Sequence, residues 1–177
     1  MPASTSSHQG GSLSEQRMRP DVRGIVQLAV VEASNRGSES VGAEHLLLAL
    51  LFDRGNPAAV LLRGSGLDYE GLTAALAGER TASLRAAGVE PVPAERLQSS
   101  GRRGRPRFAT SFKQALATGH RLAPTQRSHT MRHADVAIGV LAAELGTVPR
   151  ALALAGFDRK ALLTVLWRGG EGPRQTA

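Results

Sequence analysis

Four arginines lie close together in one short stretch, GRRGRPRF, at residues 101–108, where they surround a glycine and a proline. Guanidinium groups bind phosphate, and arginines on an extended backbone can enter the narrow minor groove of A·T-rich DNA, where negative potential is concentrated. Glycine lets such a backbone approach the groove floor, and proline keeps it extended. The stretch has two interpretations, a DNA-contacting segment or a solvated linker. Its arginines are Arg102, Arg103, Arg105 and Arg107.

Two other groupings could carry chemistry. HTMRHAD places His129, His133 and Asp135 at spacings that could hold a metal ion along one helical turn. Helical H-x-x-x-H is common by chance, however, so we predict no metal site. Ser65 in RGSGL lacks the pattern around a hydrolase nucleophile and marks a turn, and neither lysine follows a glycine as an ATPase phosphate loop requires. We therefore expect neither an enzyme nor a bound cofactor.

Composition narrows the class of protein. A chain of 177 residues with 41% hydrophobic residues is long enough for one domain with a real core. The lack of cysteine excludes disulfides, thiol nucleophiles and thiolate metal sites. A net charge of +7 favours acidic partners such as nucleic acid. Residues 1–16 are polar and no apolar run approaches a membrane span, so we expect a cytoplasmic protein without membrane contact.

The hydrophobic spacing is helical nearly throughout, and β-branched alternation is absent. The polar ends, 1–16 and 169–177, are expected to be disordered because they carry too little apolar surface to offset the ordering entropy. Asp68 and Asp158 stand where helix N-caps belong. The predicted helices cover residues 20–35, 43–53, 57–64, 68–87, 109–122, 132–144, 147–155 and 158–168.

The second four helices copy the first four. A shift of 90 residues aligns Gly66 and Asp68 with Gly156 and Asp158, and it aligns the leucines of one set with apolar residues of the other without a gap. We therefore predict an all-α fold of two pseudo-symmetric four-helix repeats packed as one domain. Its parts are repeat one at 17–87, a linker at 88–107 and repeat two at 108–168.

The block VGAEHLLLALLFDRG, preceded by VQLAVVEASNRG and followed by AAVLLRGSGLDYEGL, closely resembles the Clp N-terminal domain. This is the double four-helix repeat at the head of ClpC-type and ClpB-type unfoldases. The resemblance runs from about Met18 to Trp167 and is weaker in the second repeat, where the motif reads RHADVAIGVL. It implies a domain that catalyses nothing and receives adaptors and substrates. Since no ATPase loop is present, we expect a stand-alone monomer.

The resemblance also implies a phosphoarginine site, built in ClpC-type domains from a threonine near the first helix and the glutamate of the motif. Glu44 matches the glutamate, whereas Arg19 occupies the threonine position. Arg19 could hold phosphate, or it could pair with Glu44 and close the site. Ala109 and Ala134 replace both residues in repeat two, so that site is expected to be lost. Alternatively, Glu44 is only a first-turn glutamate that the helix dipole favours, and His45 packs against the core or caps the helix.

The family's other ligand surface is an apolar groove between the repeats, bound by adaptors and, in actinobacterial ClpC, by cyclic peptide antibiotics. Phe108 matches a phenylalanine of this surface, and Met18 holds the corresponding place in repeat one. Methionine suits an adaptable binding face. Phe112 lies one turn after Phe108, and the two rings could instead fasten the fifth helix to the core. We expect a peptide groove at Met18, Phe108 and Phe112.

Together these features predict a non-enzymatic binding protein that modulates Clp-dependent proteolysis by sequestering or delivering ligands. The expected partners are peptides, Clp adaptors or substrates, cyclic peptides directed at ClpC, and ClpC itself. RGRP, at residues 103–106, resembles an AT-hook. The alternative is therefore a DNA-binding transcriptional regulator with the repeats as its ligand sensor. The linker interpretation is favoured because one four-residue motif in an arginine-rich chain is weakly specific.

Overall fold

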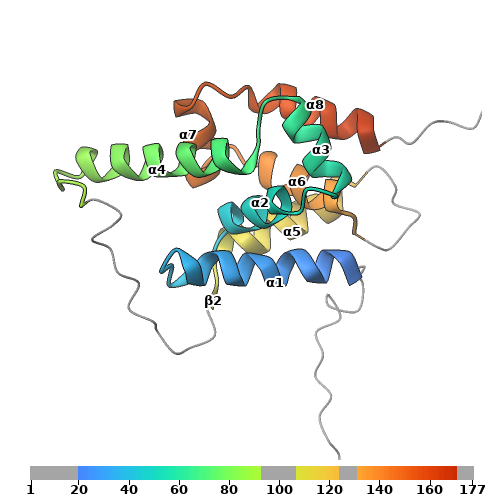
Figure 1. Cartoon of the computed structure of the whole chain (residues 1–177), viewed down its shortest axis with the longest axis horizontal. Coiled ribbons are helices and arrows are strands. Elements are labelled where there is room, and N and C mark those ends of the chain that lie inside the picture. The colour runs from blue at the N-terminus through green and yellow to red at the C-terminus, as the bar shows by residue number, and fades with distance from the viewer. Residues whose placement is uncertain (1–19, 93–106, 124–130, 171–177) are drawn as a thin grey trace, which may run out of the picture.

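The computed structural model describes residues 20–92, 107–123 and 131–170, which form eight α-helices and two short strands (Figure 1). The predicted all-α class is confirmed. In chain order the elements are α1 Pro20–Asn35, β1 Ser40–Val41, α2 Ala43–Phe52, α3 Pro57–Gly64, α4 Tyr69–Ala86, β2 Arg107–Phe108, α5 Thr110–Leu122, α6 His133–Leu141, α7 Thr147–Leu154 and α8 Arg159–Gly170.

The internal repeat is visible in the helix starts. Each of α5, α6, α7 and α8 begins 90 residues after α1, α2, α3 and α4 respectively. Local signals repeat as well: the carboxylates of Asp68 and Asp158 accept hydrogen bonds from first-turn N–H groups of α4 and α8. Gly66 and Gly156 have φ values of +88° and +78° just after α3 and α7. We call residues 90 positions apart counterparts.

Three features differ from the sequence prediction. α6 ends at Leu141, three residues before the expected end, because the chain turns toward Gly146, whose φ is +117°. α8 continues to Gly170, two residues beyond the expected 168. The strands were not predicted. β1 and β2 pair in parallel, Ser40 with Arg107 and Val41 with Phe108, and two residues are too few to show alternation.

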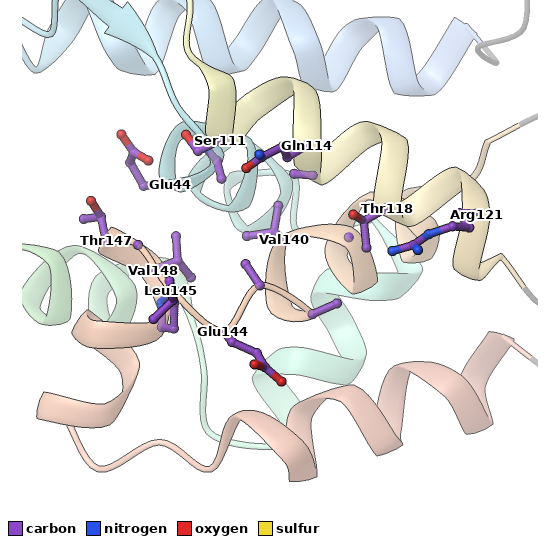
Figure 2. A pocket seen from close by; sticks show the side chains of 17 residues that line it. Glu44, Ser111, Gln114, Thr118, Arg121, Val140, Glu144, Leu145, Thr147 and Val148 are labelled. Carbon is purple, nitrogen blue, oxygen red and sulfur yellow. Dashed lines mark hydrogen bonds between the residues drawn. The ribbon is translucent and has the colours of Figure 1, made fainter.

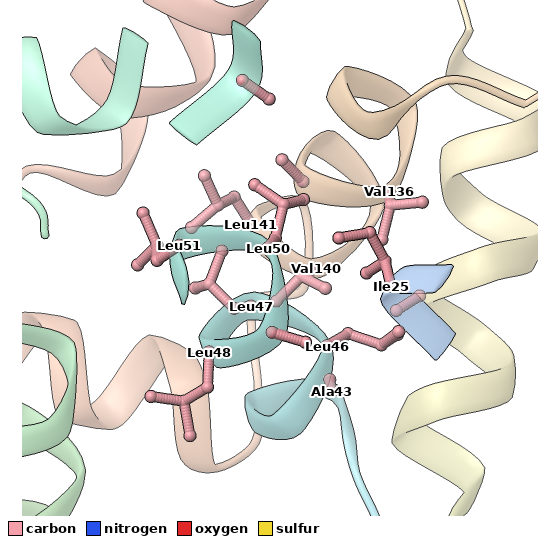
Figure 3. Close-up of a cluster of buried hydrophobic side chains, with 14 of the residues drawn as sticks. Ile25, Ala43, Leu46, Leu47, Leu48, Leu50, Leu51, Val136, Val140 and Leu141 are labelled. Carbon is pink, nitrogen blue, oxygen red and sulfur yellow. The ribbon is translucent and has the colours of Figure 1, made fainter. Parts of the chain in front are cut away.

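The core is centred on α2 and α6. The leucines of α2 are at most 1% exposed although they point to all sides of the helix (Figure 3). A helix that is apolar all round must be covered all round, and here α1, α3, α4, α5, α6 and α7 contact α2. The outer helices exchange partners: α4 packs on α7, and α3 packs on α8. The two repeats therefore share one core.

Within the described ranges, no individual helix has the length and apolar character needed to cross a membrane. α2 and α3 meet that test only when taken together, and a bend of 93° separates them. The leucines of α2 that satisfy the test are those of the core.

Candidate functional site

A cleft of about 590 Å³ opens between the two repeats (Figure 2). We call it the inter-repeat cleft. It is bounded by the first turn of α2, one face of α5, the end of α6 and the start of α7. Val140, Leu145 and Val148 contribute apolar surface, so the cleft combines polar groups with an apolar wall, as peptide sites commonly do. The polar side chains on its wall include Glu44, Ser111, Gln114, Thr118, Arg121 and Thr147.

The strand pair brings the two repeats together at this cleft. After β2, the N–H of Ala109 donates to the carbonyl of Val41 at 2.9 Å. One turn further, the N–H of Ala43 donates to Ser111 Oγ at 3.3 Å. The first turn of α2 in repeat one is therefore held beside the first turn of α5 in repeat two.

Glu44 is the acidic group of the cleft from repeat one, and 26% of its side chain is exposed. Its carboxylate folds over Gly42, where any Cβ atom would overlap it. Burial is the main cause that raises the pKa of Glu44, with a smaller contribution from the charge of Glu79; a hydrogen bond from its own backbone N–H opposes them. A cation that entered the cleft would stabilise the charged carboxylate.

His45, beside Glu44, has a structural role. Its Nδ1 accepts a hydrogen bond from the N–H of Gly42 at 2.9 Å and so caps the first turn of α2 from one side, since Gly42 has no side chain to return such a bond. Burial lowers the pKa of His45 to about 4, with Arg36 adding to the effect and Glu32 opposing it. The ring is therefore neutral near pH 7, and the 3.4 Å approach of Glu44 Oε1 to Nδ1 is not an ion pair. The capping interpretation is confirmed.

The two phenylalanines of the expected groove lie in different environments. Phe112 is 4% exposed and belongs to the core, whereas Phe108 in β2 is 42% exposed. Their ring centroids are 4.5 Å apart, so Phe108 stacks on a ring that the core holds fixed. Phe108 therefore has an exposed aromatic surface, and the buried ring of Phe112 supports it.

Several predicted site residues lie outside the described residues, namely Met18, Arg19, Arg102, Arg103 and Arg105. Arg107 is described and is exposed in β2. The sequence interpretation paired Glu44 with Arg19 of its own repeat. The described residues bring Glu44 to the cleft that Ser111 of the other repeat also lines.

Repeat two has no acidic residue at the position of Glu44, although its Glu144 lines the inter-repeat cleft (Figure 2). Ala134 is the counterpart of Glu44, and Asp135 is the counterpart of His45. Asp135 caps α6 by accepting from the N–H of Arg132 at 2.8 Å. His129 lies outside the described residues, and within the described part of the chain no three metal-ligating side chains are close enough to share an ion.

Sequence reasoning missed most of the cleft. Ser111, Gln114, Thr118 and Arg121 are spaced three and four residues apart, which places them on one helical face. That spacing was a usable signal for a polar face on α5. Nothing in it showed that β2 would place this face beside Glu44, because the strand pair joins residues 67 positions apart.

Comparison with known proteins gives one family and one fold. The sequence model of the Clp repeat (R) N-terminal domain matches residues 7–99. Among solved structures, the N-terminal domain of the caseinolytic protease associated chaperone ClpD from Arabidopsis thaliana is similar, with a TM-score of 0.62 and 19% sequence identity. That match covers 89% of this chain and 97% of the other, and it shows the shared fold. No curated protein matches the chain.

Proposed function

The chain belongs to the Clp repeat (R) N-terminal domain family, and from that premise we propose that it is a non-enzymatic, peptide-binding regulator of Clp-dependent proteolysis. Membership supports a protein-binding role in Clp systems in general. In our proposal the protein acts as a cytoplasmic monomer and sequesters or delivers ligands. These ligands are substrates, adaptors or cyclic peptides directed at ClpC.

The observation that carries this proposal is the half-buried carboxylate of Glu44 in the inter-repeat cleft. A cationic group of a peptide would offset the cost of burying this charge. Along the same wall, the side chains of Ser111, Gln114 and Thr118 offer hydrogen-bonding groups for a peptide backbone. Phe108, which belongs to the strand pair and does not line the cleft itself, is 42% exposed three residues before Ser111 and offers an apolar anchor there.

The first experiment is a calorimetric titration with a ClpC-directed cyclic peptide. We expect Phe108→Ala to weaken binding about tenfold, since truncating an aromatic anchor that a ligand contacts costs more than 1 kcal/mol. Val60→Ala is the matched control, because Val60 is an apolar side chain of α3 that is also about half exposed. Equal affinity of Phe108→Ala and wild type, or no heat at high micromolar peptide, would contradict the proposal.

Glu44 is tested separately with an arginine-phosphorylated peptide. Glu44→Gln keeps the shape and removes the charge, so binding should weaken, while the exposed Glu90→Gln should bind as wild type. Sedimentation with purified ClpC then separates two roles. An adaptor must bind ClpC itself, whereas a decoy need only bind what ClpC binds.

A second candidate function is DNA binding. α5 carries Lys113, His120 and Arg121 and no acidic residue, and it follows the exposed Arg107 of β2. A basic face of this kind attracts the phosphate backbone. Fluorescence anisotropy with an A·T-rich duplex should show salt-sensitive binding that is lost when Arg103→Ala and Arg105→Ala are combined. Unchanged affinity of the double variant would exclude this function.

A further inference from the structure

The end of α6 in repeat two is capped by an arginine of the chain itself. Arg159, the first residue of α8, donates from one guanidinium nitrogen to the carbonyls of Leu141 and Ala143, both at 2.8 Å. The last carbonyls of a helix have no partners within it and form the negative end of its dipole. A guanidinium is therefore well suited to this place.

Repeat one has a tyrosine where repeat two has this arginine. Tyr69 is the counterpart of Arg159, and its hydroxyl donates to the carboxylate of Glu32 on α1, 3.0 Å from both oxygens. Glu32 is buried, and its counterpart is Leu122, so repeat two offers no carboxylate there. Tyr69 is thus drawn toward α1 and does not cap α2.

A pocket of about 550 Å³ lies at the C-terminal end of α2. We call it the α2-end pocket. It is the counterpart of the region that Arg159 fills. Among the described residues no side chain donates to the carbonyl of Leu51, the counterpart of Leu141, whereas the carbonyl of Asp53, the counterpart of Ala143, already accepts from the N–H of Asn56 at 3.1 Å. Its lining residues are Leu51, Phe52, Arg54, Arg63, Asp68, Tyr69 and Glu70.

We propose that the α2-end pocket binds the guanidinium of an arginine side chain from a polypeptide partner, in the place that Arg159 fills in repeat two. The carbonyl of Leu51, near the negative end of the α2 dipole, supplies an acceptor for its N–H groups. Phe52 is 58% exposed and meets Tyr69 edge-on, with ring centroids 5.8 Å apart, so its ring is available to a cation. The exposed carboxylate of Glu70 adds negative charge at the same pocket.

The charges of the pocket also favour a particular kind of residue next to that arginine in the partner. Arg54 and Arg63 line it too, and the guanidinium of Arg63 donates to the carbonyl of Arg54. These two cations favour a ligand in which an acidic residue adjoins the arginine, because an isolated basic peptide would meet their repulsion. The preferred sequence is therefore an arginine beside an aspartate or glutamate.

This pocket is separate from the inter-repeat cleft. Glu44 lies in the first turn of α2, whereas Phe52 is its last residue. The inference rests on the proposed function in one respect, that the partner is a polypeptide. A negative result at one site does not imply a negative result at the other. Glu44→Gln should leave binding at the α2-end pocket unchanged.

The test is a nuclear magnetic resonance titration of the full chain with the peptide acetyl-Ala-Arg-Asp-Ala-amide. We expect saturable shifts at the backbone amides of Phe52, Tyr69 and Glu70. The same peptide with citrulline, which keeps the shape and loses the charge, should bind about tenfold more weakly or not at all. Equal binding of the two peptides, or no saturable shift at the pocket, would overturn the proposal.

Variants of Tyr69 provide the sharper comparison. Tyr69→Arg is combined with Glu32→Leu, which gives repeat one both residues of repeat two and removes the carboxylate that would otherwise pair with the introduced guanidinium. The chain's own guanidinium should then fill the pocket and reduce peptide affinity at least about tenfold. Tyr69→Phe combined with Glu32→Leu supplies no cation, so it should still bind. If the first double variant does not fold, Glu70→Gln should weaken binding about threefold, with its counterpart Lys160→Gln as the control. Wild-type affinity of the first double variant, or of Glu70→Gln where that variant replaces it, would overturn the assignment.

Discussion

The two repeats share one arrangement of helices but fill it with side chains of different size. At one set of buried positions, repeat one has Ile25, Ala29 and Ala49 on α1 and α2. Their counterparts on α5 and α6 are Ala115, Gly119 and Gly139. In repeat two the backbones themselves are in contact, because a Cβ on Gly139 would overlap the carbonyl of Ala115 and one on Gly119 would overlap that of Asp135.

This difference shows how a duplicated fold absorbs a loss of side-chain volume. Helices packed through small residues approach more closely than helices separated by larger ones. Ala115 and Gly139 also line the inter-repeat cleft. The small residues that bring α5 and α6 together thus leave room beside Glu44 for a ligand.

The substitution with the largest expected effect on this difference between the repeats is Gly139→Ala. We expect a loss of about 3 kcal/mol in the free energy of unfolding, because backbone cannot move aside as a flexible side chain can. Urea denaturation measures it. The control is Gly78→Ala in α4, where a Cβ meets nothing within 4 Å.

That control should stabilise the protein by up to about 1 kcal/mol through helix propensity alone. If Gly139→Ala unfolds at the same urea concentration as wild type, the close backbone contact between α5 and α6 does not limit the size of the side chain at position 139. The two repeats would then be equally tolerant of added volume.

The next prediction concerns the side chains that accept from the backbone N–H before α2 and α6, His45 in repeat one and Asp135 in repeat two. The pKa of His45 is about 4 in the fold, against an ordinary value of 6.5. Above pH 6.5 both the folded and unfolded states hold a neutral ring. As the pH falls from 6.5 toward 4, the unfolded state takes up a proton first, so stability is lost in this window.

We expect this loss to be on the order of 2 kcal/mol by linkage. His45→Asn should remove it, because an amide oxygen can accept from Gly42 and does not titrate. The raised pKa of Glu44 acts in the opposite direction, since the folded state then binds that proton more readily than the unfolded state. The measurement is the free energy of unfolding of both proteins between pH 4 and pH 7. Parallel pH profiles would contradict the prediction.

The smallest expected effect compares the exchanged helix pairs. α4 is tied to α7 by the buried carboxylate of Glu79, which accepts from Arg150 at 2.8 and 2.9 Å and from Ser83 at 2.7 Å. Their counterparts, Gly169 and Val60, cannot form such a pair between α8 and α3. Arg150→Met should cost about 1–2 kcal/mol, less than a fully buried pair because the side chain of Arg150 is 61% exposed.

Arg85→Met is its control, because Arg85 is an exposed arginine in the last turn of α4, the helix that carries Glu79. Thermal unfolding should separate the two variants by a few degrees. Identical melting curves would mean that the apolar surfaces alone join α4 to α7.

The sequence was sufficient for the helices because their signals are local. Each of these signals depends on a few neighbouring residues: the apolar spacing, the caps at Asp68 and Asp158, and the glycines after α3 and α7. The internal repeat also allowed the helices predicted in one half to be compared with those in the other. Family resemblance then identified Glu44 and Phe108 as residues of interest.

The remaining features depend on contacts between distant residues. The strands β1 and β2 were not predicted because each is two residues long and forms only by pairing with the other. Two side-chain contacts also depend on residues far apart in the sequence. Arg159 donates to the carbonyl of Leu141, and Tyr69 bonds to Glu32 on α1 and does not turn to the end of α2. A sequence read alone shows the residue types there but not the direction in which a side chain turns.

The exchange of outer helices between the repeats has a consequence for how such a molecule could originate. Each repeat uses a helix of the other to cover its own apolar surface, α7 on α4 and α3 on α8. One repeat by itself would therefore need a second copy to complete it, as in a two-fold symmetric dimer. The chain has the architecture of such a dimer joined end to end. After that fusion the halves could diverge, one keeping an acidic site and the other the glycine contacts.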